Sequence, residues 1–456
     1  MENIFQRTGD PFIDAGGMAL EYISEQFPEK SIDELIEWAA KIYVEKWRAK
    51  IDAIFLNSSI THNSKQGAEK VTATISKFKE IKNSSNNEGY CRFCGKEAFL
   101  TDAGRDQTCL AGSKAFVNFH HSHESGIMIC PECAEKYFFL PFAVLQMGNL
   151  CLLQTITEEG NEYWKHKTVQ ENLNRISRGS SETILKSKFT RASNAIFHFA
   201  SELITACDYK LESEHITMYH FTNFSSSVDC KISTIPNPVF RFINLVLKTS
   251  AREWYNFIYR NYHIGGAKWN DETDRWEKKG EPVEEDEYRN HTNSIFNSLL
   301  EGKSILPSLV RYSKKQLIKE KTIDSRIAIY YVQEVKGMTS EQISLIKSVG
   351  GRIFEIMQQE NNFKKYMVKL EGATKAYQLR TAILNIIKKN YTTGNERTIV
   401  TFDEWVNYLF PDGQYWGEIR DLLLVFLYEK LHSGRIKIDI DDVEQINEPL
   451  EENEGI

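Results

Sequence analysis

The sequence predicts an α+β fold, in which a mixed N-terminal body carries a small cysteine-bearing insertion and ends in an α-helical bundle. Three observations support this prediction. Two Cys-x-x-Cys pairs lie far apart, helical and strand-like apolar spacings alternate through most of the chain, and residues 336–437 show helical spacing. A chain of 456 residues also exceeds the roughly 250 to 300 at which one core stops growing. We expect these parts: an N-terminal segment at 1–87, the insertion at 88–148, the remaining α+β body at 149–335, the bundle at 336–437 and an acidic tail at 438–456.

The chain opens with a segment rich in turn-forming residues. Two aspartates, a proline and three glycines within residues 8–17 (TGDPFIDAGG) are typical of an ordered turn whose backbone can approach a partner closely. The segment matches neither a dinucleotide-binding glycine pattern nor a P-loop. A helix is expected from Ser31 to about Phe55, because Ser31 and Glu34 form a capping box ahead of an apolar stripe. Polar loops at 57–67 and 83–89 follow.

The insertion is defined by two cysteine pairs separated by 35 residues. Each pair can form a tight knuckle, and Gly95 and Pro131 suit the turns that a knuckle needs. Four thiolates complete a tetrahedral shell and leave no open coordination position, so we predict one structural zinc ion in a zinc-ribbon-like insertion. The predicted ligands are Cys91, Cys94, Cys130 and Cys133.

Three histidines between the pairs leave other hypotheses open. His120, His121 and His123 are candidates for a ββα-metal nuclease, a class that twin cysteine knuckles often brace, or one of them replaces a cysteine ligand. Against the nuclease, no asparagine and downstream histidine follow Cys133 to complete a hydrolytic metal site. A further alternative is a zinc-braced scaffold that contacts only protein partners.

The body after the insertion shows mixed spacing. The apolar run from Tyr137 to Leu145 indicates core packing, and Pro236 and Pro238 interrupt the chain before a further helix. The charged, tryptophan-bearing stretch at 265–287 is a hairpin or a mobile loop. Other expected elements are a helix over 183–207, a strand over 214–221 with a loop at 222–227, a helix over 240–258 and apolar periodicity over 295–309.

The last part is expected to form a compact bundle with a basic face. Helices are predicted from 339 onward, and over 361–372, 374–389, 401–409 and 418–431. Residues 336–437 hold 15 Lys and Arg against 11 Asp and Glu. Such a density with tyrosines between the cations is what a phosphate-tracking groove needs, although most basic faces are simply solvated. The candidates are Lys364, Lys365, Lys369, Lys375, Arg380, Lys388 and Lys389.

Composition limits the other possibilities. The formal net charge is −7, but residues 439–456 hold eight acids and no base, so the rest of the chain is close to neutral. Nucleic-acid binding would therefore depend on local basic surfaces. We find no secretory signal and no apolar run long enough for a membrane span, and the other four cysteines show no disulfide-like spacing. We expect a cytoplasmic protein with reduced thiols and no membrane partner.

The opening segment 8–16, the twin cysteine pairs and the terminal bundle together resemble the CXXC-CXXC family of CRISPR-associated proteins, the large subunits of the type I-B Cascade complex. The resemblance implies a non-enzymatic, prokaryotic subunit of an antiviral surveillance complex. Its partners would be crRNA, target double-stranded DNA, the backbone, handle-binding and small Cascade subunits, and a recruited helicase-nuclease. The subunit would read the protospacer-adjacent motif and aid R-loop formation, while guide pairing supplies sequence specificity.

The resemblance also assigns expected positions to parts of this chain. The opening motif would lie at the crRNA handle end, with Thr8, Gly9, Asp10 and Asp14 as candidates. The bundle resembles the small subunit, its basic face would support the displaced strand, and Met338 is a candidate internal start. The motif-reading residues do not carry over, so they are chosen for short polar or basic side chains in loops: Asn223, Ser225 and Lys231, then Asn63 and Lys65.

Overall fold

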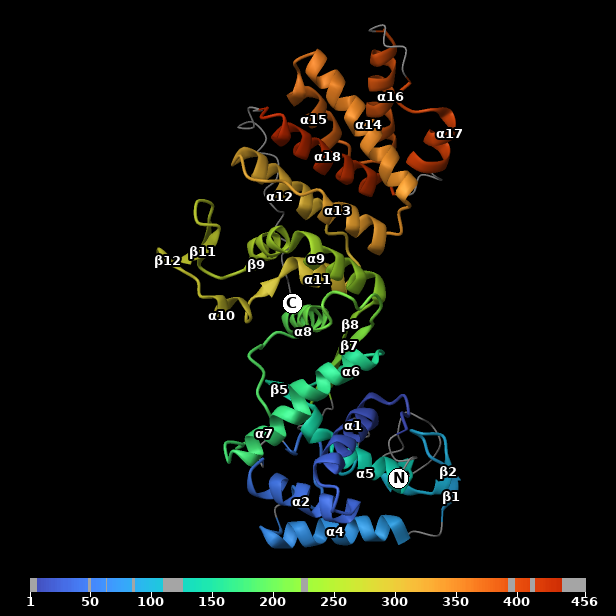
Figure 1. The fold of residues 1–456 in the computed structure, drawn as a ribbon, viewed down its shortest axis with the longest axis vertical. Helices are drawn as coiled ribbons and strands as arrows, with labels where there is room; N and C mark the ends of the chain where they lie inside the picture. The colour runs from blue at the N-terminus through green and yellow to red at the C-terminus, as the bar shows by residue number, and fades with distance from the viewer. Residues whose placement is uncertain are drawn as a thin grey trace, which may run out of the picture. The chain divides into compact units, whose positions relative to one another are not determined.

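The computed structural model describes residues 6–47, 51–62, 64–83, 87–109, 126–222, 229–392, 398–410 and 415–436. These parts combine many helices with small antiparallel sheets, which confirms the predicted α+β class (Figure 1). The chain divides into two compact units, Met1–Phe240 with Val283–Thr292 and Arg241–Pro282 with Asn293–Ile456. The finer boundaries proposed from the sequence stay predictions.

The first unit begins with a helix where the sequence analysis expected a turn. Residues 11–17 form the first two turns of α1 (Pro11–Gln26), so the turn prediction is wrong beyond Asp10. Asp10 caps this helix, because its Oδ1 accepts hydrogen bonds from the backbone N–H groups of Phe12 and Ile13, both at 2.9 Å. Pro11 suits the first helical position, where an N–H would have no intrahelical partner.

An aromatic core fills the first unit. Tyr43 donates to the carbonyl oxygen of Phe138 at 2.8 Å, and Trp47 packs on Phe142 with ring centroids 5.0 Å apart. The capping box at Ser31 is confirmed, but the helix ends at Glu45 rather than near Phe55. Residues 137–145 lie in this core, as predicted. The elements here are α2 (Ile32–Glu45), α4 (Ala68–Asn83), α5 (Pro131–Phe138) and η1 (Leu140–Ala143).

A four-stranded antiparallel sheet in the order β5-β6-β7-β8 lies beside this core, with α8 packed on β7 and β8. The predicted strand is confirmed as β7, whereas the helix expected from residue 183 begins only at Ala192. The segment before it is extended, and Ser187 donates to the carbonyl of Gln146. The elements are β5 (Leu145–Met147), β6 (Asn149–Gln154), α6 (Glu158–Lys165), η2 (His166–Gln170), α7 (Glu171–Ser177), α8 (Ala192–Ala206), β7 (Ile216–Thr222), β8 (Asp229–Ile235) and α10 (Glu285–Tyr288).

The second unit begins within α9 (Asn237–Arg260), a long helix kinked at Ser250. Pro238 lies in its first turn instead of interrupting the chain, because a proline is tolerated there. The stretch after residue 265 is the hairpin alternative of the prediction, with Trp269 opposite Trp276 across two strands. The elements are β9 (Tyr262–His263), β10 (Ala267–Asn270), β11 (Arg275–Lys278), β12 (Glu281–Pro282), β13 (Thr292–Asn293), α11 (Ser294–Leu300), α12 (Leu306–Ile318), α13 (Arg326–Tyr330) and η3 (Tyr331–Val335).

The predicted bundle is present and α18 is its central helix. Consecutive residues of α18 from Ile419 to Leu431 are mostly buried, since α12, α14, α15 and α16 all contact it (Figure 1). Gly350 permits one of these approaches, because a Cβ there would lie 2.6 Å from Phe426. The elements are α14 (Ser340–Gln359), α15 (Phe363–Glu371), α16 (Ala376–Thr392), α17 (Phe402–Glu404), η4 (Trp405–Leu409) and α18 (Trp416–Ser433).

Candidate metal centre

Two knuckles bring the four predicted cysteine ligands together. The first lies between β1 (Glu88–Tyr90) and β2 (Glu97–Phe99), where Gly95 has a φ of +69° and donates to the carbonyl of Cys91 at 2.9 Å. Glycine fits this left-handed backbone without strain. The second follows β4 (Ile127–Ile129), and Cys130 precedes α5 while Cys133 lies in its first turn. β3 (Thr101–Ala103) pairs with β4, and Arg92 donates to Met128 across the two knuckles.

The cysteine geometry fits a tetrahedral metal site. All four Sγ atoms lie within 4.8 Å of one another, and the Sγ atoms of Cys94 and Cys130 are 3.7 Å apart. Zn–S bonds of about 2.3 Å at tetrahedral angles separate sulfur atoms by about 3.8 Å. Cys91, Cys130 and Cys133 are each at most 3% exposed, so the cluster is largely closed to solvent. Four clustered cysteines that can bind a metal ion are therefore present, as predicted.

Cys91, Cys130 and Cys133 change one another's thiol pKa strongly. Hydrogen bonds from Cys130 and Cys133 lower the pKa of Cys91, and hydrogen bonding to Cys130 and Cys91 raises the pKa of Cys133. The backbone N–H of Cys130 also donates to the Sγ of Cys91 at 3.4 Å. N–H donors of this kind stabilise a thiolate, the form in which cysteine binds metal.

The metal centre is coupled to the opening segment through α5. An ideal Cβ at Gly16 of α1 would lie 2.0 Å from the carbonyl oxygen of Lys136 in α5, so only glycine permits the contact between these helices. Figure 1 shows α1 and α5 side by side. Lys136 also donates to the carbonyl of Gln6 at 2.6 Å. Sequence reasoning missed Lys136, because its partners lie more than a hundred residues away and leave no local signal.

The opening candidates hold one another in place. Asp14 accepts from the backbone N–H of Thr8 at 2.7 Å and from that of Gly9 at 3.0 Å, while the Thr8 hydroxyl accepts from the N–H of Asp10. Burial raises the pKa of Asp10, which the N–H groups of Ile13 and Phe12 oppose. These side chains thus fix the start of α1, and their contact with crRNA stays a prediction.

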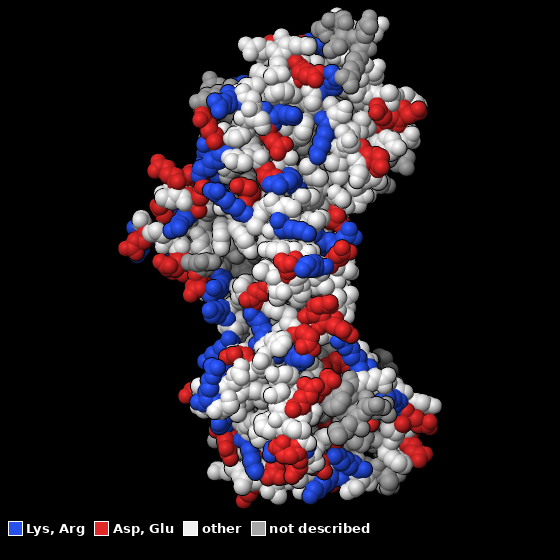
Figure 2. Space-filling view, viewed as in Figure 1, with Lys and Arg blue, Asp and Glu red and all other residues white. Residues whose placement is uncertain are grey.

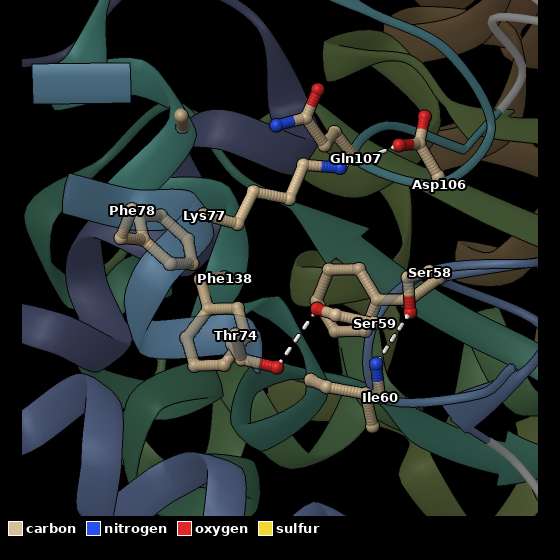
Figure 3. Close-up of a pocket in the computed structure, with 11 residues that line it drawn as sticks. Ser58, Ser59, Ile60, Thr74, Lys77, Phe78, Asp106, Gln107 and Phe138 are labelled. Atoms are coloured by element: carbon tan, nitrogen blue, oxygen red, sulfur yellow. Dashed lines mark hydrogen bonds and ion pairs between the residues drawn. The ribbon is translucent and has the colours of Figure 1, made fainter. Parts of the chain in front are cut away.

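A small cavity lies beside the insertion but is too small for a substrate. It measures about 30 Å³ and lies between α4, the loop at 58–60 and the insertion. Figure 3 shows Lys77 reaching Asp106, whose carboxylate lies 2.6 Å from the lysine Nζ, and Ser59 bonded to Thr74. This volume suits about one water molecule. The ion pair instead ties the insertion to α4.

The predicted DNA-reading residues are only partly described. Lys231 is exposed in β8 and Lys65 is exposed in the loop before α4. Asn63, Asn223 and Ser225 lie outside the described residues, as do His120, His121, His123 and the acidic tail. The structure thus adds nothing to the nuclease alternative.

The basic candidates of the bundle lie on or beside two consecutive helices that contact each other, α15 and α16. Arg380 packs over Phe410 with its guanidinium 5.2 Å from the ring centroid, and Lys389 pairs with Glu360. These two serve the fold at least in part. Those exposed are Lys364, Lys365, Lys369, Lys375 and Lys388.

Comparison with known proteins leaves the chain unassigned: no protein-family model matches it, and no curated protein matches it significantly. Among the helices described, none combines the length and apolar character needed to cross a membrane.

Proposed function

We propose that this chain is the large subunit of a type I-B CRISPR Cascade complex, a non-enzymatic subunit that recognises the protospacer-adjacent motif in target DNA. The complex would also contain crRNA, backbone, handle-binding and small subunits, and would recruit a helicase-nuclease after R-loop formation.

One observation carries most of this proposal. The two sequence features specific to the family resemblance, the opening motif and the cysteine pairs, are built into one body, because α1 packs on α5 at Gly16 and α5 carries Cys133. The coupling supports treating them as one feature rather than as two chance matches.

We further propose that the cluster holds a single structural zinc ion. The short sulfur separations and the burial of three of the cysteines fit zinc, and four thiolates leave no position at which a substrate or water could bind. The ion would hold the two knuckles together and, through α5, fix the start of α1. Cys91, Cys94, Cys130 and Cys133 would be its ligands.

Two of the DNA-facing residues of this proposal, Lys231 and Lys65, lie within the described part of the chain. Lys231 lies on β8, three residues after the end of the segment 223–228, and Lys65 lies in the loop ahead of α4. Both lysines are exposed and thus available to phosphate oxygens. Base-edge contacts would come from Asn223, Ser225 and Asn63.

The test is a selection on reconstituted complexes. A duplex pool with a protospacer matched to the guide and a randomised flanking sequence is bound to the complex assembled with and without this chain. We expect enrichment of particular flanking sequences only when the chain is present, with no cleavage by the chain itself. A complex with Lys231→Gln should bind the selected duplex more weakly than one with Lys210→Gln, an exposed lysine elsewhere in the first unit.

Each of the other outcomes would indicate a different function for this chain. Equal binding with and without the chain would reduce it to a protein scaffold. Cleavage of the duplex by the isolated chain in Mg²⁺ or Mn²⁺, lost on replacing His120, His121 and His123, would establish the nuclease alternative instead.

A further inference from the structure

The second unit contains a cationic cluster that the sequence analysis did not single out. It forms where the end of α9, the β10–β11 hairpin and the end of α12 meet. Arg260 contacts Asp271 at 3.0 Å through Nη2, and Lys319 pairs with the same carboxylate. The side chains of Arg260 and Lys319 are only 11% and 19% exposed. Two cations thus converge on a single acid in the turn of the hairpin.

Two more cations extend the cluster along α12. Arg311 and Lys315 precede Lys319 at four-residue steps, so the three lie along one side of the helix. Burial lowers the pKa of Lys315, and the neighbouring charges of Arg260, Lys319 and Arg311 lower it further while Asp271 opposes them. Like charges at this spacing destabilise a helix by about 0.2 to 0.5 kcal/mol per pair. The fold therefore gains nothing from this arrangement by itself.

The cluster also holds buried donors without a partner in the described part of the chain. Arg260 Nη1 and the indole Nε1 of Trp269 are both buried and make no hydrogen bond. The Arg260 guanidinium lies 5.5 Å from the Trp269 ring centroid, so the two donors are neighbours. A buried donor without an acceptor costs about 1 to 3 kcal/mol. Two such donors at one cationic site therefore call for an explanation.

Among the charges that act most strongly on Lys315, three are cations (Arg260, Lys319 and Arg311) and one is an acid, Asp271. Asp271 is shared by Arg260 and Lys319. Burial raises the pKa of Asp271, but the hydrogen bond to Lys319 and the charges of Arg260, Lys319 and Lys315 together lower it. Glu272 and Asp274 lie in the same hairpin turn, and Asp274 pairs with Lys321. Figure 2 shows lysine and arginine side chains over the α12 region, with acidic and basic side chains mixed over the neighbouring hairpin. An anionic ligand would balance this charge.

We propose that Arg260, Arg311, Lys315 and Lys319 form a binding site for the phosphodiester backbone of a nucleic acid. From Arg311 to Lys319 the helix rises by about 12 Å, at about 1.5 Å per residue, which is longer than a single phosphate and suits a row of them. Arg260, whose side chain is 11% exposed, would add its charge at the hairpin end of the site, and the α12 cations would follow the strand. This inference depends on the proposed function in one respect, which is that the nucleic acid is taken to be the target DNA.

The test compares two charge-matched double variants of the full chain. One is Arg311→Gln with Lys315→Gln; the control is Lys210→Gln with Lys303→Gln, whose side chains are 80% and 72% exposed. The probes are a labelled DNA duplex of arbitrary sequence, a labelled single strand and inorganic phosphate. We expect the α12 variant to bind the duplex roughly tenfold more weakly than the control, and its salt slope to fall by about 1.8, or about 0.9 per lost contact.

Three results would overturn the proposal. The first is that the unmodified chain does not bind the duplex at low salt, and the second is that the α12 variant binds it as tightly as the control does. The third is that inorganic phosphate displaces more of the duplex than chloride does at equal ionic strength, which would indicate a site for free phosphate. Binding that depends on α12 without any preference for a flanking sequence would preserve this site and refute the proposed motif recognition. The two ideas therefore fail separately.

Discussion

Replacing Gly16 with alanine tests how the opening segment and the metal centre are joined. An ideal Cβ at Gly16 would lie 2.0 Å from the Lys136 carbonyl oxygen and 2.8 Å from its carbon. Because both atoms belong to the backbone of α5, no side-chain rotation can relieve the overlap. The helices would have to separate by about 1.4 Å to reach an ordinary 3.4 Å contact.

The expected cost follows from two opposing effects. Overpacking of this kind costs about 1 to 3 kcal/mol, and the backbone-to-backbone overlap places Gly16→Ala at the upper end. Alanine in a helix interior gains about 1 kcal/mol over glycine. We therefore expect a net loss of about 2 kcal/mol, or about 4 to 8 °C in the unfolding temperature of a unit of this size. Gly17→Ala is the matched control, since its Cβ would meet only the flexible Lys136 side chain at 3.3 Å.

Metal release is the appropriate measurement. The chain has two units, so a global signal can mix two transitions. A chromogenic chelator follows release from the cysteine cluster during urea unfolding and reports on the unit that contains α1 and α5. Gly16→Ala should release metal at lower urea than the unmodified chain, and Gly17→Ala at equal or higher urea. Release at unchanged urea from Gly16→Ala would show that the helices do not approach closely at this point.

Two further predictions concern the same unit. Cys94→Ser should lose both the metal and the fold of the insertion, since binding of structural zinc contributes on the order of 10 to 16 kcal/mol to folding. Cys207→Ser is the control and should keep one zinc per chain by elemental analysis. A folded Cys94→Ser that retains its metal would contradict the ligand assignment. Burial alone would raise the pKa of Glu202, but hydrogen bonds from His198 and Lys167 lower it to about 2. The stabilisation is thus present above the ordinary value of 4.5 and lost as the pH falls toward 2. Glu202→Gln should cost on the order of 1 kcal/mol at neutral pH, after allowing for exposure, and less at about pH 3 by urea unfolding; equal costs at both would refute this.

The features that were predicted correctly from the sequence are those encoded by residues close together in the chain. The cysteine spacing and the glycine at position 95 specify two knuckles within a few residues, and the capping box at Ser31 marks a helix start as the structure has it. The turn prediction at 11–17 was wrong because the meaning of Gly16 depends on Lys136, which no nearby residue reveals. A glycine that admits another helix and one that forms a turn look the same in sequence.

The α12 cluster illustrates the same dependence for function. Arg311, Lys315 and Lys319 are visible in the sequence as cations at four-residue steps, a pattern that usually means a solvated helix face. Only the hairpin brings Asp271 to one end of that row and covers Arg260 with Trp269, which leaves two donors buried without an acceptor. The near-neutral charge of the chain without its tail is thus compatible with strong local attraction for a polyanion, since binding depends on how cations are grouped rather than on their sum.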